Sequence, residues 1–237
     1  MSADGALVIG ASSAIASALI QALSARQYQV VAVSRRAANG DHPDVRWLQC
    51  DYSPAQIADT VAALRDKPLT WRRVFICNGV LHDEAMPEKR LEDLSLETLE
   101  ARLRSNSIVP MLWLQALLPI LRGKTPCHIA VLSARIGSIG DNQLGGWYSY
   151  RASKAALNML LKTAAIECSR RAKNLKFIAF HPGTTDTPLS APFQASVPED
   201  KLFSPAFVSE QLLALCDNCP VDGQLSYLDW AGKAIDW

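Results

Sequence analysis

The chain has 237 residues, 49% of them hydrophobic and 20% charged, and a formal net charge of +1. A chain of this length buries roughly three quarters of its unfolded surface, and its near-zero charge argues against nucleic acid or an anionic membrane as a partner. The longest apolar stretch, residues 108–121, contains Gln115 and Pro119 and is shorter than the roughly 20 residues of a membrane span. Because no basic segment leads into an apolar one at the start, the sequence predicts a cytoplasmic protein.

Short apolar runs alternate with longer helical segments along the whole chain. The runs that read as strands are Ala6–Ile9, Gln29–Val33, Val45–Gln49, Arg73–Cys77, His128–Leu132, Leu175–Phe180 and Gln224–Leu228. Their nearly continuous apolar character is typical of parallel strands that are covered on both faces. The alternation predicts an α/β fold: one Rossmann-type domain over residues 1–237, with a doubly wound parallel sheet of about seven strands and helices on both faces. In such a sheet the ligand site lies at the carboxyl ends of the strands.

Serine residues mark the expected starts of several helices. Ser53-Pro54-Ala55-Gln56 has the pattern of a capping box with proline at the first helical position, and Ser95 and Ser204 are further candidate caps. Residues 147–172 carry a helical apolar stripe that includes Leu157 and Leu161.

The turn after the first strand is placed to hold a phosphate. Backbone N–H groups and the dipole at a helix N-terminus favour anions, and such loops use glycine because the backbone approaches the phosphates closely. Here only Gly10 is present, Ala14 and Ala16 fill the other small positions, and Ser12 and Ser13 can donate hydroxyl hydrogen bonds. An ordinary tight turn between strand and helix is the alternative.

The end of the second strand indicates which dinucleotide is preferred. NAD enzymes place an acidic residue there for the ribose 2′-hydroxyl, whereas an arginine accommodates the 2′-phosphate of NADP. Ser34-Arg35-Arg36 contains two arginines and no acid, so we predict NADP(H) in preference to NAD(H). The alternative is that Arg35 and Arg36 are a solvated pair in a loop.

Tyr150 and Lys154 are the predicted catalytic pair. Their spacing of four residues places both side chains on one face of a helix. A neighbouring ammonium lowers the pKa of a phenol, which can then protonate a carbonyl oxygen or accept a proton from an alcohol. Four residues beyond Tyr148 lies Ala152, which cannot take part. A surface pair is the alternative reading of an isolated pattern of this kind.

These landmarks occur in the order of the short-chain dehydrogenase/reductase family, which the chain resembles over essentially its whole length. They are Gly10-Ala11-Ser12-Ser13, Asp51, Cys77-Asn78-Gly79, Asn106, Tyr150 with Lys154, and Pro182-Gly183-Thr184-Thr185-Asp186-Thr187. The resemblance implies that Asp51 contacts adenine and that Asn106 supports a water relay to the lysine. It also implies that Lys154 binds the nicotinamide ribose and that Thr187 holds the carboxamide. The segments 133–139, 145–150 and 227–237 are similar to the branch of C-factor and sniffer-type carbonyl reductases.

The catalytic serine departs from the family pattern. It usually lies three residues before the glycine that ends the fifth strand, and counting back from Gly137 gives Ala134. Ser133 points to the opposite face of a regular strand, and Ser138 lies in the following loop. We predict Ser133 as the donor to the substrate carbonyl, with Ser138, or neither residue, as the alternatives.

The resemblance divides the expected site between a cofactor half, about residues 1–125, and a catalytic and substrate half, about residues 126–237. The expected catalytic residues are Tyr150, Lys154, Ser133 and Asn106. The residues expected to bind cofactor are Gly10, Ser12, Ser13, Ile15, Ser34, Arg35, Asp51, Asn78, Gly79, Tyr150, Lys154, Pro182, Gly183, Thr185 and Thr187. Within this set, Cys77-Asn78 shifts the asparagine by one position from the family pattern.

Two functions of different classes follow. The first is an NADP(H)-dependent oxidoreductase that interconverts a carbonyl and an alcohol, with hydride carried by the nicotinamide. The second is a noncatalytic dinucleotide-binding or signalling protein on the same fold, which the single loop glycine and the displaced serine favour. Trp147 and Tyr148 could line an apolar substrate pocket, or they could pack in a loop or in a subunit contact.

Further expectations concern partners and metals. The resemblance implies a homodimer or homotetramer, in which Trp113, Leu117 and Leu160 could form the contact or belong to the core. We expect a small carbonyl or alcohol substrate, and neither nucleic acid nor membrane as a partner. The pair Cys216 and Cys219 lacks further metal ligands and ends a helix instead of opening one, so we expect no metal and no redox role.

Overall fold

The computed structural model describes residues 3–37, 44–65, 69–83 and 86–237. Its main sheet is parallel and has the order β3-β2-β1-β4-β5-β6-β9. The strands are β1 (Asp4–Ile9), β2 (Gln29–Ser34), β3 (Arg46–Gln49), β4 (Thr70–Ile76), β5 (Cys127–Leu132), β6 (Leu175–His181) and β9 (Leu225–Asp229). All seven predicted strands are confirmed, with ends that differ by at most three residues. The order reverses between β1 and β4, where a ligand crevice is expected.

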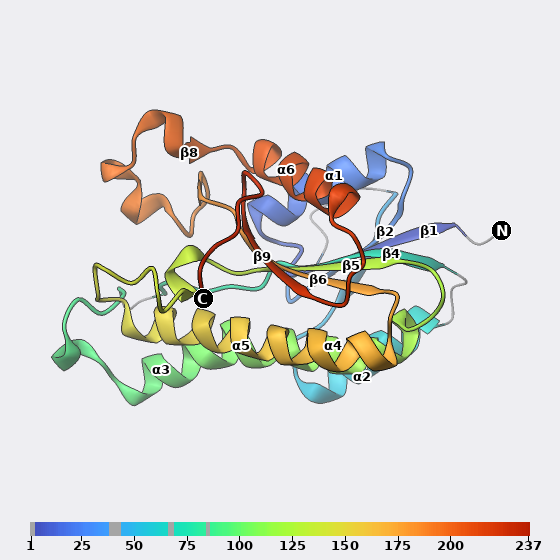
Figure 1. The fold of residues 1–237 in the computed structure, drawn as a ribbon, viewed down its shortest axis with the longest axis horizontal. Helices are drawn as coiled ribbons and strands as arrows, with labels where there is room; N and C mark the ends of the chain where they lie inside the picture. Colours follow the sequence, from blue (N-terminus) through green and yellow to red (C-terminus); the bar gives the residue numbers. More distant parts are fainter. Residues whose placement is uncertain (1–2, 38–43, 66–68, 84–85) are drawn as a thin grey trace.

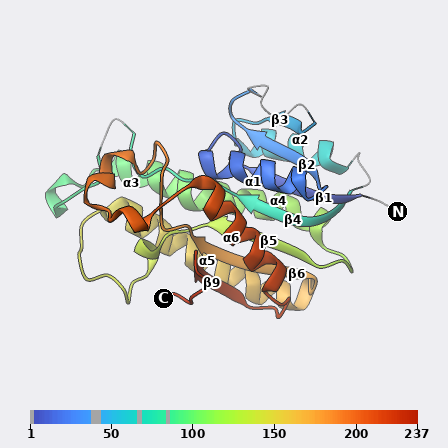
Figure 2. The same cartoon turned by 90° about the horizontal axis from the view of Figure 1, so that it is seen from above.

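Helices cover both faces of the sheet, as predicted (Figure 1). One face carries α1 (Ala14–Ala25) and α6 (Pro205–Asn218), which lie side by side (Figure 2). The other carries α2 (Pro54–Arg65), α4 (Val109–Leu121) and α5 (Tyr148–Arg171), with α3 (Leu96–Leu103) at its far end. None of the helices in the described ranges is long and apolar enough to cross a membrane.

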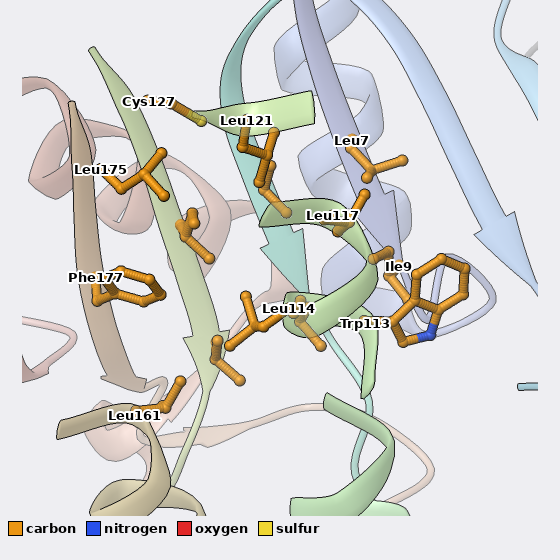
Figure 3. Close-up of a cluster of buried hydrophobic side chains, with 14 of the residues drawn as sticks. Leu7, Ile9, Trp113, Leu114, Leu117, Leu121, Cys127, Leu161, Leu175 and Phe177 are labelled. Carbon is orange, nitrogen blue, oxygen red and sulfur yellow. The ribbon is translucent and has the colours of Figure 1, made fainter. Parts of the chain in front are cut away.

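Each face of the sheet has its own apolar core. Because successive side chains of a strand point to opposite faces, Leu7 and Ile9 of β1 pack toward α4, whereas Ala6 and Val8 pack toward α1. Figure 3 shows Leu7 and Ile9 with Trp113 and Leu117 of α4. Trp113 and Leu117 are fully buried, so the core alternative is confirmed for them, while Leu160 of α5 is 39% exposed.

The predicted serine caps are present. Ser95 and Ser204 accept hydrogen bonds from the backbone N–H groups three residues further on, at 3.1 Å each. Ser53 accepts from the N–H of Gln56, but the Gln56 side chain accepts from the N–H of Asp51 instead of returning to Ser53. The Gln56 side chain, which would complete a capping box, therefore holds the chain just after β3.

Three local features have no counterpart in the sequence prediction. A π-helical turn, η2 (Arg104–Ile108), joins α3 to α4. A second small sheet pairs β7 (Thr184–Thr185) with β8 (Leu202–Phe203), and between them runs a 3₁₀ segment, η4 (Ala191–Ser196). Residues 145–147 all adopt left-handed backbone conformations before α5.

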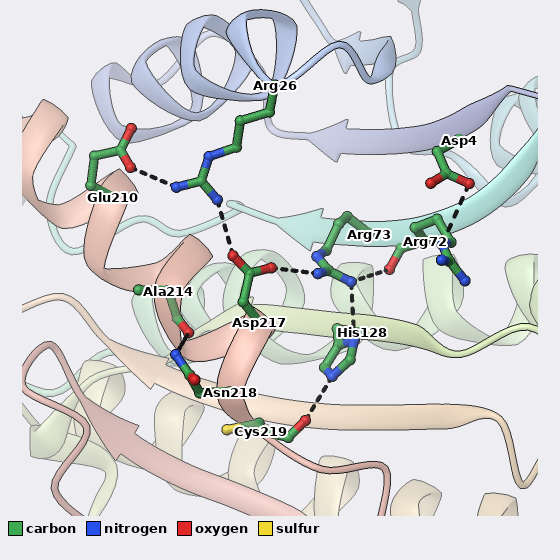
Figure 4. Close-up of polar contacts among 10 residues, drawn as sticks. All are labelled: Asp4, Arg26, Arg72, Arg73, His128, Glu210, Ala214, Asp217, Asn218 and Cys219. Carbon is green, nitrogen blue, oxygen red and sulfur yellow. Dashed lines mark hydrogen bonds and ion pairs between the residues drawn. The ribbon is translucent and has the colours of Figure 1, made fainter.

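A charged cluster joins elements at the amino ends of the strands (Figure 4). Asp217 of α6 accepts from Arg73 of β4 at 2.6 Å and from Arg26 at the end of α1 at 3.2 Å. Arg73 also lies 3.2 Å from His128 Nδ1, and His128 Nε2 lies 2.8 Å from the carbonyl oxygen of Cys219. Since a carbonyl only accepts, Nε2 carries the proton and Nδ1 accepts from Arg73.

Candidate active site

The turn after β1 keeps a phosphate-loop shape despite its alanines. Gly10 has φ +79°, and a Cβ atom there would lie 2.9 Å from the carbonyl carbon of Cys77. Only glycine fits this approach of β1 to β4. Ser13 caps α1 by accepting from the N–H of Ala16 at 3.2 Å, and Ala16 is buried in the core. The alanine methyl group of Ala16 thus packs beneath the helix, away from the loop.

A polar cavity of about 180 Å³ opens beside this turn. It is lined by Gly10, Ser12, Ser13, Arg35, Asp51, Tyr52, Cys77, Asn78, Gly79, Val80, Arg104, Ser105 and Val109. Arg35 lies over the Tyr52 ring, 5.9 Å from its centroid, and the carboxylate of Asp51 accepts from the N–H of Ser53. Hydrogen bonds from the side chain and the backbone of Ser53 lower the pKa of Asp51. The buried Oδ1 of Asn78 has no hydrogen-bond partner among the described residues. These groups fit an adenine nucleotide: a helix N-terminus, an arginine and an unpaired acceptor face one cavity.

A second cavity of about 450 Å³ continues from the first and holds the predicted catalytic pair. Of the predicted residues, it is lined by Ser12, Ser13, Ile15, Asn78, Gly79, Ser133, Tyr150, Lys154, Pro182 and Thr187. Arg36 lines it too, so the two arginines after β2 face neighbouring cavities. Ser34 is fully buried and its hydroxyl accepts from the N–H of Arg36 at 2.9 Å, so it shapes this turn from inside.

Gly183 and Thr185 lie just beyond the cavity lining. Gly183 has φ +71°, and a Cβ atom there would lie 2.7 Å from the Phe203 ring. Thr185 is buried and pairs with Phe203 across the small sheet. These two residues fasten the segment after β6 to β8, and they thereby place Thr187 at the cavity.

Tyr150 and Lys154 lie in the first two turns of α5, and both side chains are buried. Lys154 Nζ donates to the carbonyl oxygen of Leu132 at 2.8 Å and lies 5.9 Å from the Tyr150 ring centroid. Burial lowers the pKa of Lys154 to about 8. Burial, with a smaller effect of nearby Tyr227, raises the pKa of Tyr150 above its usual value. Desolvation, and not the expected lowering by the lysine, therefore determines the direction of the Tyr150 pKa in this structure.

Asn106 lies in the π-turn and is fully buried. Its Oδ1 accepts from the N–H of Val80 at 2.7 Å, and its Nδ2 donates to the Val80 carbonyl and to Ser153 Oγ, both at 2.9 Å. Ser153 Oγ in turn donates to the Tyr150 carbonyl at 2.8 Å. A Cβ atom on Gly79 would lie 3.6 Å from Lys154 Nζ and 4.0 Å from Asn106 Oδ1. The missing side chain of Gly79 thus leaves space between the lysine and the asparagine.

The serine candidates differ in where their hydroxyls lie. Ser133 lines the larger cavity, and its Oγ donates to Asn158 Oδ1 at 2.6 Å. Ser138 is buried, and its Oγ accepts from the N–H of Asp141 at 3.0 Å. Ala134 packs against Tyr150 in a small apolar cluster. Ser133 stays the predicted carbonyl donor.

Sequence reasoning missed several residues of the site. Arg104 lines the smaller cavity from the π-turn, and Phe193 of η4 packs beside Trp147 with ring centroids 4.8 Å apart. Arg102 of α3 is buried and donates to the Leu81 carbonyl at 3.2 Å and to Asp83 at 2.7 Å, which holds the loop after β4. An arginine on a short helix is a weak signal, and the contact of Phe193 with Trp147 depends on tertiary packing.

A family model for short chain dehydrogenases matches residues 4–197. The chain belongs to this family. It is 28% identical over 147 residues to the C-signal protein of Myxococcus xanthus, a match that covers 62% of this chain and 83% of that protein. The fold is similar to that of the carbonyl reductase Sniffer of D. melanogaster, with a TM-score of 0.83 at 19% identity over 99% of this chain and 100% of that one. It is equally similar to a short-chain dehydrogenase/reductase of Burkholderia multivorans with bound NADP, with a TM-score of 0.84 at 24% identity over 99% and 100% of the two chains. The short-chain dehydrogenase assignment and its resemblance to the C-factor and sniffer-type branch are therefore confirmed, and the protein is an oxidoreductase.

Proposed function

We propose that this short-chain dehydrogenase is an NADP(H)-dependent carbonyl reductase that interconverts an aldehyde or ketone with the corresponding alcohol. The observation that carries this proposal is the continuity of the two cavities. One runs past Arg35 and the helix N-terminus after β1, and the other contains Tyr150 and Lys154. A dinucleotide held in the first would extend toward the catalytic pair in the second.

NADP(H) is favoured over NAD(H) by the charges around the first cavity. Arg35 and Arg36 face neighbouring cavities, and the solved Burkholderia neighbour was crystallised with NADP. A guanidinium forms charge-assisted hydrogen bonds with a 2′-phosphate, whereas its hydrogen bond to the uncharged 2′-hydroxyl of NAD is much weaker. When bound, the nicotinamide supplies or accepts the hydride.

The residues of the chain handle the proton. Tyr150 is the general acid in carbonyl reduction, because its raised pKa keeps the hydroxyl protonated at neutral pH and ready to donate to the carbonyl oxygen. Lys154 carries positive charge below its pKa of about 8 and stabilises the tyrosinate that forms. Ser133 is the proposed second donor to the carbonyl, in exchange for its bond to Asn158. Tyr150 regains its lost proton by a transfer that passes through the space between Lys154 and Asn106.

The experiment that tests the function combines cofactor binding with turnover. Fluorescence titration should show tighter binding of NADPH than of NADH, and Arg35→Ala should weaken NADPH binding by about 1.5–3 kcal/mol, the range of a hydrogen bond to a charged group. Arg65→Ala, on the exposed end of α2, is the matched control and should bind like the wild type. Tyr150→Phe should bind NADPH normally and lose carbonyl reduction by at least about 100-fold.

The noncatalytic alternative makes different predictions for the same proteins. If the wild type binds NADPH but reduces no carbonyl compound in a broad panel, the dinucleotide-binding reading replaces the reductase. Turnover that survives in Tyr150→Phe would remove Tyr150 from the mechanism, and equal affinity for the two cofactors would remove the NADP(H) preference.

A further inference from the structure

A small apolar cluster surrounds Tyr150, apart from the two cores of the sheet. Leu81, Ala134 and Tyr150 form it, and Ile136, Trp147 and Phe193 pack against it. Four of the rings around this site follow one another in an unbroken row, which we call the aromatic wall: His82, Phe193, Trp147 and Tyr150. The successive centroid distances are 5.8, 4.8 and 6.3 Å, with interplanar angles of 67°, 56° and 68°. These are the distances and tilts that aromatic pairs prefer.

Trp147 is held in this row at a conformational cost. Its φ is +52°, which a non-glycine residue rarely adopts, and Gly145 and Gly146 before it are also left-handed. Strained backbone of this kind persists only where the surroundings enforce it, and it concentrates at functional sites. The strain turns the chain sharply before α5, and Trp147 then contacts both Tyr150 and Phe193.

Glu88 and Arg151 hold this turn through hydrogen bonds from its two sides. The N–H of Trp147 donates to the Glu88 carbonyl, and the buried Glu88 carboxylate accepts from the N–H of Ser149 at 3.3 Å. From the other side, the Arg151 guanidinium donates to the carbonyls of Gly145 at 3.1 Å and Gly146 at 2.9 Å. With its guanidinium engaged in this way, Arg151 holds the loop that bears Trp147.

The opposite end of the aromatic wall is fastened to the segment after β7. His82 Nε2 lies 3.1 Å from the Leu189 carbonyl, and the His82 ring packs on Phe193 of η4. Leu189 and Pro188 also line the larger cavity. The two ends of the aromatic wall, His82 and Tyr150, line the larger cavity together with Pro188 and Leu189, and Phe193 and Trp147 pack between these two ends.

We propose that the aromatic wall selects the substrate of this site: an uncharged carbonyl compound with an aromatic ring a short distance from the reacting carbon. This inference rests on the proposed reductase function. With its oxygen at the Tyr150 hydroxyl, such a substrate extends along the aromatic wall toward His82, where ring contacts add to the burial of apolar surface. Trp147 is the specificity-determining residue, and Glu88 and Arg151 are positioning residues that act through it.

The test compares two methyl ketones of equal carbon number, 4-phenyl-2-butanone and 2-decanone, in NADPH-dependent reduction by the full chain. Because neither carbonyl is conjugated, their intrinsic reactivities are similar. The wild type should favour the phenyl ketone by about tenfold in kcat/KM, as one favourable ring contact supplies. Trp147→Ala should abolish most of this preference by lowering kcat/KM for the phenyl ketone alone, and Trp147→Phe should retain it.

Two further variants guard against misfolding. Phe193→Ala alters the wall from η4, without touching the strained turn, and should reduce the same preference. Leu144→Ala lies in the same loop as Trp147 but with its side chain 93% exposed, and it should leave both rates unchanged. Equal loss of both activities in Trp147→Ala with no change of preference in Phe193→Ala would overturn the aromatic wall as a specificity determinant.

Propanal, a third substrate, separates this inference from the proposed function. If propanal or 2-decanone is reduced and the phenyl ketone is not preferred, the inference fails and the reductase stands. If no carbonyl compound is reduced by the wild type although NADPH binds, both fail.

Discussion

The burial of Lys154 in the folded protein lowers the pKa of its ammonium group. Burial brings its pKa down to about 8, whereas the pKa of Tyr150 is raised, so the lysine is the group that titrates near the working range. Its ammonium form, which stabilises the tyrosinate, dominates below pH 8 and is lost as the pH rises. We therefore expect kcat/KM for carbonyl reduction to decline above about pH 8.

Replacing Lys154 with arginine tests whether the alkaline decline comes from the loss of the lysine charge. Lys154→Arg keeps a charge at all accessible pH values, so its slower reaction should show a flat alkaline limb in a pH profile measured at saturating NADPH. An unchanged alkaline limb in that variant would assign the decline to another group.

At the scale of single residues, the spacing of Tyr150 and Lys154 along a helix is a local property that predicts both side chains on one face. Asn106 is predicted only from the resemblance to the family. The local sequence does not predict the direction of the Ser133 hydroxyl, which depends on Asn158, nearly three turns into α5. Nor could it predict the pKa of Tyr150, because burial and the approach of Tyr227 from β9 are set by tertiary packing.

Gly137 determines how closely two elements pack. It ends η3 (Arg135–Gly137), and a Cβ atom on it would lie 2.8 Å from the backbone carbon and Cβ of Lys154. Gly137→Ala should therefore push the loop after β5 away from α5, lower the free energy of unfolding by about 1–3 kcal/mol and reduce activity.

The chain offers a matched control in Gly123, where an added Cβ would meet nothing within 4 Å. Gly123→Ala should change the free energy of unfolding by no more than about 0.5 kcal/mol in urea denaturation. Equal stability of the two variants would show that α5 and η3 can separate without cost.

The elements that were predicted well are those with strong local signals. β1, β2 and β5 contain continuous apolar runs of at least four residues, and α6 begins at a proline that follows a serine cap. The π-turn, the β7–β8 pair and the left-handed turn before α5 depend on contacts between distant segments. Trp147 would not be placed in a left-handed conformation by any local preference.

For the whole molecule, the buried His128 and the partly buried His181 contribute to the response to acid. Burial lowers the pKa of His181 from 6.5 to about 4 and also lowers that of His128, beside Arg73. The folded protein thus takes up these protons less readily than the unfolded chain does. The free energy of unfolding should be highest above pH 6.5 and should decrease as the pH drops toward 4. His181 should account for a decrease of up to about 3 kcal/mol.

Urea denaturation at a series of pH values measures this effect. His181→Asn and His128→Gln should each flatten the dependence between pH 6.5 and pH 4, because the substituted side chain takes up no proton. A slope that both variants leave intact would place the acid sensitivity in other groups.

The π-turn at Arg104–Ile108 makes the site depend on the length of a helix as well as on its residues. Such a turn accommodates one more residue than an α-helical turn does. Deleting Ser105 would restore a regular helix and rotate α3 relative to α4 by roughly 100° about their common axis. Asn106 or Arg102 would then leave its partner, since one bonds Val80 and the other Asp83. A change in length of a single residue here would therefore break one of these two contacts while leaving both side chains chemically unchanged.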